Sequence, residues 1–319
     1  MNTTPGTPDP SLAAYTVIGS GGRPAPASRI SVVVLNRGGR IYRARQLQDL
    51  ERAGFAEVVS VEEGGEGRHE LEALVSRFPS TRFAVVPAGL TPGERANIGF
   101  REARMPWVLL LWNDQKLAAG GLSSRFVDRI EERAWLCATP WYRARDGETL
   151  PAIGAPALEG SALRVLSLEP REDGEKALFP LDYAGVYSKA RFEALGGFDR
   201  EYSRPWWQLV EFGFRAWLRG ELLGSAQALR VDYVEAPPAY DTSPGPDYRR
   251  FHLRSLAPVR RSDAAHLPWS RFLPYAAGAG VGIGEAYREF KAARAWVADN
   301  AFRFRVDARA LVDLWEPIP

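Results

Sequence analysis

Short apolar segments alternate with amphipathic helical segments over residues 29–114. The apolar segments are 30–36, 56–62, 81–88 and 106–114, and the segments between them with helical periodicity are 42–54, 69–78 and 92–104. Each apolar segment is continuous, which is typical of strands buried on both faces of a sheet. Strands joined in this way by helices lie parallel, with helices on both faces. The pattern therefore predicts an α/β fold with a mostly parallel, Rossmann-like sheet flanked by helices.

The order changes in the second half of the chain. Residues 123–136 predict another amphipathic helix, 143–176 predict loops with a short hairpin, and 206–220 predict a helix that Gly220 ends. Residues 240–270 have little periodicity and are typical of a connecting segment, and 282–302 predict a helix. We therefore expect a flexible N-terminal arm (1–28), a main domain (29–240) and a partly helical C-terminal extension (241–319).

Composition and charge exclude several classes of protein. The 319 residues include 41 basic and 39 acidic residues, and so balanced a charge gives no reason to expect a nucleic-acid partner. The single cysteine, Cys137, excludes an intrachain disulfide and fits a reduced, cytoplasmic setting. The first 28 residues do not have the pattern of a signal peptide, and no apolar run approaches the roughly eighteen residues of a membrane span. Any contact with a membrane is therefore expected to be peripheral.

Polar side chains follow three of the predicted strands. They are Asn36 and Arg37, then Glu62 and Glu63, then Asn113, Asp114 and Lys116. The carboxyl ends of parallel strands meet at one edge of a sheet, and that edge is where α/β proteins usually bind ligands. A simpler interpretation stays open, because Asn and Asp often end strands and begin turns, and the two glutamates precede two glycines.

Five segments resemble the family 2 glycosyltransferases, which are nucleotide-sugar enzymes of the GT-A fold. "ISVVVLNRGG" is similar to the first strand of that family, "VVSVEEGGE" to the second strand, "GLTPGERANIGFREARMPWVLLLWND" to the segment that leads into an Asp-X-Asp motif, "SKARFEALGGFDREY" to a Gly-Gly-Phe-Asp turn and "EFGFRAWLRG" to a following helix. The match covers roughly residues 29–235. Each segment alone is weak evidence, and their common order makes the resemblance specific.

The resemblance implies a nucleotide-sugar donor and transfer of a hexosyl or related sugar, with inversion, to a glycan or other hydroxyl acceptor. It also implies a divalent metal, Mn²⁺ or Mg²⁺, at Asp114, because carboxylates grip such an ion and the ion neutralises the departing diphosphate. By the same resemblance the donor is held by Asn36, Arg37, Glu62, Glu63, Arg95, Asn97, Asn113 and Lys116.

The sequence departs from the family pattern at two positions. Trp112 stands where the Asp-X-Asp motif has its first carboxylate, so that only Asp114 is left to bind a metal, and cations such as Arg37, Arg95 or Lys116 could neutralise the diphosphate in its place. Gln208 and Leu209 stand where the family has its catalytic base, and neither can take a proton. A second interpretation therefore stays open: a GT-A protein that binds a sugar or nucleotide sugar without turnover.

The nearest carboxylates that could replace the missing base are Glu211 and Asp199. Glu211 could equally be a buried acid paired with Arg215 one helical turn later, and Asp199 could simply cap the turn.

Two other motifs can be explained either by function or by structure alone. Trp206 and Trp207 could stack on a sugar ring or fill the core. The glycine-rich segment 278–284 resembles a dinucleotide loop but lacks a preceding strand, so we expect a hinge or close helix packing there.

Overall fold

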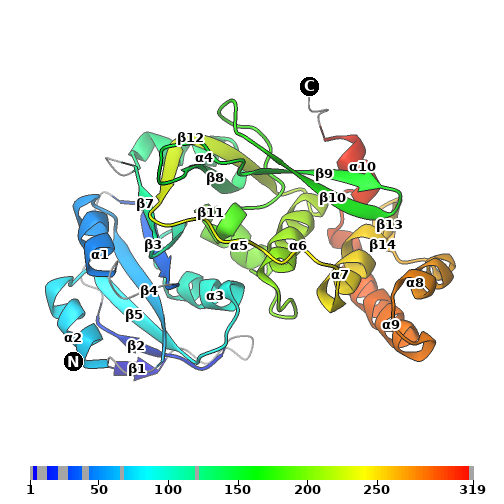
Figure 1. Cartoon of the computed structure of the whole chain (residues 1–319), viewed down its shortest axis with the longest axis horizontal. Helices are drawn as coiled ribbons and strands as arrows, with labels where there is room; N and C mark the ends of the chain where they lie inside the picture. Colours follow the sequence, from blue (N-terminus) through cyan, green and yellow to red (C-terminus); the bar gives the residue numbers. More distant parts are fainter. Residues whose placement is uncertain are drawn as a thin grey trace.

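The computed structural model describes residues 3–5, 13–20, 28–37, 43–64, 68–118 and 122–315. Its central feature is a mixed sheet with the strand order β1-β2-β5-β4-β3-β6-β11-β8-β12-β7, and helices lie on the faces of this sheet (Figure 1). Among the described residues, none of the helices combines the length and the apolar character needed to cross a bilayer.

The first half of the sheet confirms the predicted α/β pattern. Strands β5, β4, β3 and β6 lie parallel to one another in that order. The elements are β3 (Ile30–Leu35), α1 (Arg43–Arg52), β4 (Glu57–Glu63), α2 (Arg68–Arg77), β5 (Thr81–Val86), α3 (Pro92–Glu102) and β6 (Trp107–Trp112). All residues of β3 and β6 are buried, as expected of continuous apolar strands that carry helices on both faces.

The N-terminal segment adds two strands to the edge of this sheet. β2 (Thr16–Ile18) pairs antiparallel with β5, and β1 (Thr3–Pro5) pairs antiparallel with β2. Residues 1–2, 6–12 and 21–27 of the predicted arm lie outside the described residues. The described part of the arm thus includes two short strands that extend the sheet.

The second half of the sheet mixes strand directions. β11 (Gly185–Ser188) lies antiparallel between β6 and β8 (Trp135–Arg143), β12 (Leu222–Tyr233) runs parallel to β8, and β7 (Gln115–Leu117) is antiparallel to β12. The predicted helix over 123–136 was wrong at its end, because the observed helix α4 (Ser124–Glu132) ends earlier and Trp135 already begins β8. The chain reverses at Ala134, whose φ is +53°, so that the apolar residues that follow enter the core as a strand.

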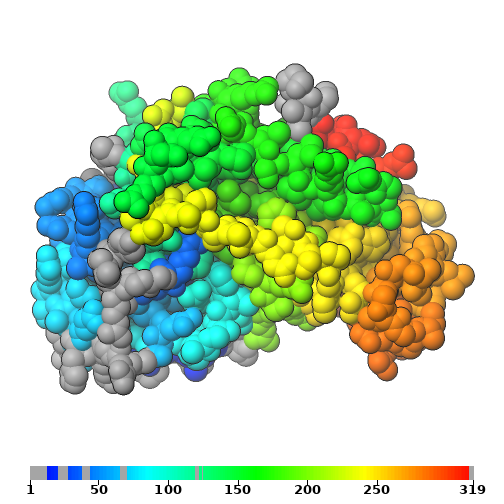
Figure 2. Space-filling model, viewed as in Figure 1, coloured from blue at the N-terminus to red at the C-terminus, as the bar shows by residue number. Residues whose placement is uncertain are grey.

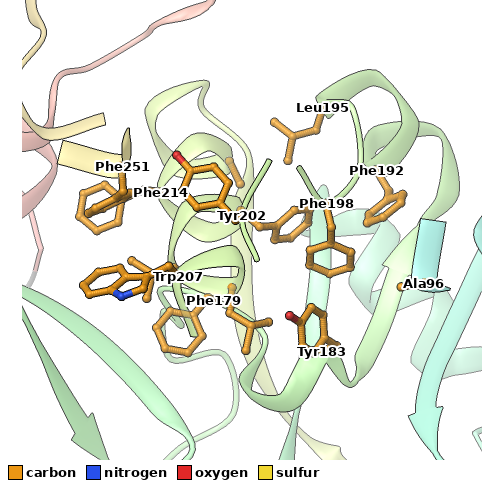
Figure 3. Packing of buried hydrophobic residues seen from close by; sticks show 14 of the residues in the cluster. Ala96, Phe179, Tyr183, Phe192, Leu195, Phe198, Tyr202, Trp207, Phe214 and Phe251 are labelled. Atoms are coloured by element: carbon orange, nitrogen blue, oxygen red, sulfur yellow. The ribbon is translucent and has the colours of Figure 1, made fainter. Parts of the chain in front are cut away.

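The remaining elements pack around helix α6 (Pro205–Leu218), which is buried over most of its length. The predicted hairpin consists of β9 (Ile153–Glu159) and β10 (Ala162–Leu168), and it is followed by a helical turn at Leu181–Tyr183 and by α5 (Lys189–Leu195). Figure 3 shows aromatic side chains packed together at α6, among them Trp207 and Phe214 of the helix itself and Phe251 from a later segment. Trp207 is thus a core residue, whereas Trp206 is half-buried.

The C-terminal residues form a mostly helical layer against α6. Its elements are α7 (Pro246–Phe251), a helical turn at His252–Leu256, β13 (Val259–Arg261), β14 (Ala264–His266), a turn at Trp269–Arg271, α8 (Phe272–Gly278), α9 (Ile283–Asp299), a turn at Ala301–Arg303 and α10 (Ala308–Asp313). Residues 278–284 join α8 to α9 and follow no strand, which excludes the dinucleotide loop. The segment 234–245, yellow in Figures 1 and 2, crosses the face of the molecule between β12 and α7.

Candidate functional site

The register of the parallel strands brings the predicted polar residues to one edge. Leu35 at the end of β3 lies opposite Val61 of β4 on one side and Trp112 of β6 on the other. The residues that follow these positions meet: Asn36 Nδ2 donates to Glu62, and the main-chain N–H of Arg37 donates to Asn113 Oδ1 at 2.9 Å.

Arg37 lies at the centre of this group. Its Nε donates to Asp114 at 2.9 Å, and its two terminal nitrogens donate to the two carboxylate oxygens of Asp182, each at 2.6 Å. The guanidinium also lies over the ring of Trp112, 4.3 Å from its centroid, in cation–π contact. Burial opposes the charge of Arg37, but hydrogen bonds and charge from Asp182 and Asp114 outweigh it and raise the pKa of Arg37. The side chain is therefore a fixed cation at the sheet edge.

Asp182 is the main residue that the sequence did not identify. Its side chain is 1% exposed, and besides Arg37 it accepts hydrogen bonds from Gln115 at 2.9 Å, Tyr233 at 2.8 Å and Tyr240 at 2.6 Å. Its φ is +53°, a left-handed conformation that is uncommon outside glycine and often marks functional sites. A lone acid in the apolar stretch 177–187 was the available signal, because buried carboxylates require partners.

Arg95 of α3 brings a second cation to the same edge. Its Nη1 donates to the main-chain oxygen of Asn36 at 2.9 Å and lies 3.5 Å from Glu63, and its guanidinium lies 5.5 Å from the centroid of Trp112. Burial is the main cause of a lowered pKa for Arg95, and the nearby charge of Arg37 lowers it further. Trp112 is thus flanked by two guanidinium groups where the family motif has a carboxylate.

Several polar atoms at this edge are buried without a partner. Among the described residues, the buried side-chain atoms without a hydrogen bond include Asn36 Oδ1, Asp114 Oδ1, Asn113 Nδ2 and Arg95 Nε. Two of these atoms are acceptors and two are donors, and they belong to the residues that the sequence assigned to the donor site. Buried polar groups are normally hydrogen-bonded, so a cluster of unpartnered ones indicates a place for a polar ligand.

Gln208, which stands where the family that the sequence resembles has its catalytic base, is fully buried. Its Oε1 accepts from the N–H of Gly93 at 3.0 Å and from the hydroxyl of Tyr183 at 2.8 Å, while its Nε2 donates to the main-chain oxygen of Asp199 at 2.9 Å. A Cβ at Gly93 would lie 2.4 Å from Oε1 of Gln208, so the close approach of α3 to α6 requires glycine there. The amide therefore ties together α3, α6 and the turn that follows α5.

The two candidate bases are held in ion pairs near this turn. Glu211, 2% exposed, contacts Arg215 Nε at 2.6 Å, and Arg215 in turn donates to the main-chain oxygen of Gly197 at 2.7 Å. Asp199 accepts from the N–H of Glu201 at 2.9 Å and lies 3.5 Å from Arg254. Both acids are thus held by cations of α6 and of the helical turn at 252–256, and not by the Arg37 group.

Asn97 and Lys116 also lie apart from the Arg37 group. The amide of Asn97 donates to the main-chain oxygen of Phe198 at 2.7 Å and accepts from its N–H at 2.9 Å, so that it fixes the Gly-Gly-Phe-Asp turn. Lys116 lines a cavity of about 310 Å³ between β7 and α1. Seven of the predicted donor-site and metal residues thus form one connected group, and these two occupy other places.

The order and directions of the strands give the chain a GT-A-like fold. No protein-family model matches the sequence, and no curated protein matches it. The structure is similar to a crystal structure of GalNAc-T7 with UDP, GalNAc and Mn²⁺, with a TM-score of 0.58, 15% identity and coverage of 86% of this chain and 57% of that chain. It is also similar to S. aureus TarS 1–349, with a TM-score of 0.51, 15% identity and coverage of 82% and 69%.

The similarity extends over only part of the longer relatives. The chain covers 39% of the full S. aureus TarS chain, with a TM-score of 0.50 and 14% identity, and little more than half of GalNAc-T7. At these identities the comparisons establish the fold, which confirms the GT-A-like architecture expected from the sequence.

The side chains at the sheet edge fit a divalent metal poorly. Of the carboxylate oxygens of Asp114 and Asp182, only Asp114 Oδ1 has no hydrogen bond. Within the described parts of the chain, no three His, Cys, Asp or Glu side chains are grouped as metal ligands would be. Ions such as Mg²⁺ take about six oxygen ligands, so Asp114 alone would leave most of the coordination to other molecules.

Proposed function

We propose that the chain is a glycosyltransferase-like protein that binds a nucleotide sugar at the carboxyl ends of β3, β4 and β6 and transfers the sugar to a glycan or other hydroxyl acceptor. One observation carries the proposal: the unpartnered buried acceptors of Asn36 and Asp114 lie in the same group as the unpartnered donors of Asn113 and Arg95. A nucleotide sugar offers both kinds of hydrogen-bonding group, on its base, its ribose, its phosphates and its sugar.

The charges at the edge suit the chemistry of transfer. As the acceptor oxygen bonds to the anomeric carbon, the bond from that carbon to the diphosphate breaks, and negative charge grows on the departing diphosphate. Arg37 and Arg95 are cations at this edge of the sheet, and they would neutralise the charge on the diphosphate. The acceptor hydroxyl must also lose its proton to a base, and Glu211 or Asp199 stays a prediction for this role.

The half-buried Trp206 is the better of the two tryptophans for contact with a sugar. Its ring centroid lies 6.1 Å from that of Tyr240, and Tyr240 in turn donates to Asp182 of the Arg37 group. An aromatic ring can stack on the apolar face of a sugar, so Trp206 would receive the donor sugar or the acceptor beside the Arg37 group.

A second candidate function is binding of a nucleotide sugar without turnover. It is favoured by the amide of Gln208 at the position of the base and by the ion pairs of Glu211 and Asp199. Membership of family 2, inversion, a cytoplasmic location, peripheral membrane contact and the absence of a nucleic-acid partner stay predictions from the sequence.

Titration with a panel of nucleotide sugars, with and without Mn²⁺, tests both functions. Calorimetry measures binding, and release of nucleoside diphosphate measures turnover. Hydrolysis or transfer supports the first function, tight binding without turnover supports the second, and failure to bind any member refutes both. Asn36→Ala and Asn113→Ala should each weaken binding about tenfold, because a polar group of the bound ligand then loses its hydrogen-bond partner. Asn300→Ala, at the end of α9, is the matched control and should leave binding unchanged.

A further inference from the structure

The guanidinium of Arg37 occupies the space between the two carboxylates that a metal ion would need. It bonds to Asp114 through Nε and to Asp182 through both terminal nitrogens. A divalent ion that joined these carboxylates would have to break all three hydrogen bonds and displace a buried cation from the ring of Trp112.

Arg37 can still reach a ligand while it holds both carboxylates. A guanidinium has five N–H groups, and three of them are used in these bonds, so two remain. The side chain is 21% exposed, and the planar fork of arginine suits the oxygens of a phosphate.

Two cations already lie at this edge. Arg37 pairs with Asp114 and Asp182, Arg95 lies 3.5 Å from Glu63, and both guanidinium groups lie beside the ring of Trp112. Positive charge is therefore present, without an added ion, where the family motif has a metal-binding carboxylate.

We propose that the guanidinium of Arg37 takes the place of a divalent metal ion, so that a nucleoside diphosphate binds at the sheet edge without metal. The part of this inference that concerns the diphosphate rests on the proposed function. The part that concerns the metal does not, because it is a statement about the ligand-free protein.

The first experiment measures Mn²⁺ binding to the ligand-free protein by electron paramagnetic resonance. We expect the wild type to bind Mn²⁺ at least tenfold more weakly than Arg37→Ala, in which Asp114 and Asp182 are released. Arg29→Ala is the matched control, since Arg29 pairs with Asp128 and Glu131 on the surface and its loss should leave Mn²⁺ binding as in the wild type. Equal or tighter Mn²⁺ binding by the wild type overturns the proposal.

The second experiment measures UDP affinity by calorimetry in EDTA and in Mn²⁺. The wild type should bind UDP equally in both within about twofold, and Arg37→Ala should lose at least tenfold in EDTA. A tenfold gain of the wild type on adding Mn²⁺ overturns the proposal. Absence of UDP binding under both conditions refutes the proposed function, and the Mn²⁺ titration then still decides the role of Arg37.

A further variant covers the case in which Arg37→Ala does not fold, since that change leaves Asp182 buried without its cation. Asp114→Asn keeps the pair of Arg37 with Asp182 and removes a competing negative charge. If Arg37 is the cation, this variant should bind UDP about threefold more tightly in EDTA. If a metal at Asp114 is the cation, it should instead bind UDP at least tenfold more weakly in Mn²⁺, and that result overturns the proposal.

Discussion

Replacing Gln208 with glutamate should make the stability of the protein depend strongly on pH. In the native chain Oε1 of Gln208 accepts from Gly93 and Tyr183, and Nε2 donates to the main-chain oxygen of Asp199 at 2.9 Å and of Tyr202 at 3.4 Å. A carboxylate would keep the first two bonds but turn a negative oxygen toward these two carbonyls. The new carboxyl group should therefore stay protonated in the fold.

The size of the effect follows from the burial of this position, since Gln208 is fully buried. Burial raises the pKa of a carboxyl group by up to about 3–5 units, and one unit corresponds to about 1.4 kcal/mol. A rise of about three units places the folded pKa near 7, against about 4.3 in the unfolded chain. Because the folded pKa is the higher one, the unfolded state loses its proton first, and stability falls as pH rises from about 4 to about 7.

Urea unfolding at pH 5 and pH 8 measures this dependence, with each variant compared with the wild type at the same pH. The free energy of unfolding of Gln208→Glu should fall by about 3 kcal/mol more at pH 8 than at pH 5. Gln208→Leu is the matched control without a titrating group: it should lose about 1–3 kcal/mol at both pH values, because the N–H of Gly93 loses its partner. If Gln208→Glu loses the same free energy of unfolding at both pH values, the side chain at this position is not buried from solvent as the structure shows.

Three further predictions follow from buried groups. Glu211→Gln should lower the free energy of unfolding by about 3–5 kcal/mol, because Arg215 keeps a buried charge without its partner; a variant of wild-type stability that has lost turnover would identify Glu211 as the base instead. Tyr240→Phe should cost about 1.5–3 kcal/mol in urea unfolding, since a hydroxyl that donates to the charged Asp182 is lost, and a loss below about 0.5 kcal/mol would contradict this. Burial raises the pKa of the Cys137 thiol, so a thiol reagent at pH 8 should modify it only as the protein unfolds, and immediate reaction of the native protein would disprove its burial.

The sequence predicted the parallel half of the sheet well because its signals there are local. The fully apolar runs of β3 and β6 are typical of strands buried on both faces, and the start of α3 is marked by Pro92 and by a capping box between Thr91 and Glu94. The end of α4 was mispredicted because Trp135 and Leu136 continue an apolar pattern that suits a helix and a buried strand equally. The pairing of β8 with β11 and β12, which come much later in the chain, decides between them.

The grouping of side chains at the sheet edge could be predicted where it depends on strand ends, and it was missed where it depends on contacts distant in the chain. Asn36, Arg37 and Asp114 follow strands of the same sheet, so their meeting could be expected from topology alone. Asp182 lies 145 residues from Arg37 in the chain, and no periodic pattern in the sequence predicts their contact. Asn97 and Glu211 were assigned to the site by resemblance. In the structure, Asn97 is hydrogen-bonded to the Gly-Gly-Phe-Asp turn and Glu211 is paired with Arg215.

The two departures from the family pattern meet at one turn of the backbone. Trp112 Nε1 donates to the main-chain oxygen of Asp182 at 2.8 Å, and the Asp182 carboxylate binds Arg37. The hydroxyl of the next residue, Tyr183, donates to Gln208 at 2.8 Å. Both residues have positive φ, +53° and +62°, a conformation that costs about 1–3 kcal/mol per residue and persists only where the surroundings enforce it. The bonds to Arg37 and Gln208 hold this turn from its two ends. The Arg37 group at the sheet edge is therefore joined to α6 through two consecutive residues, Asp182 and Tyr183.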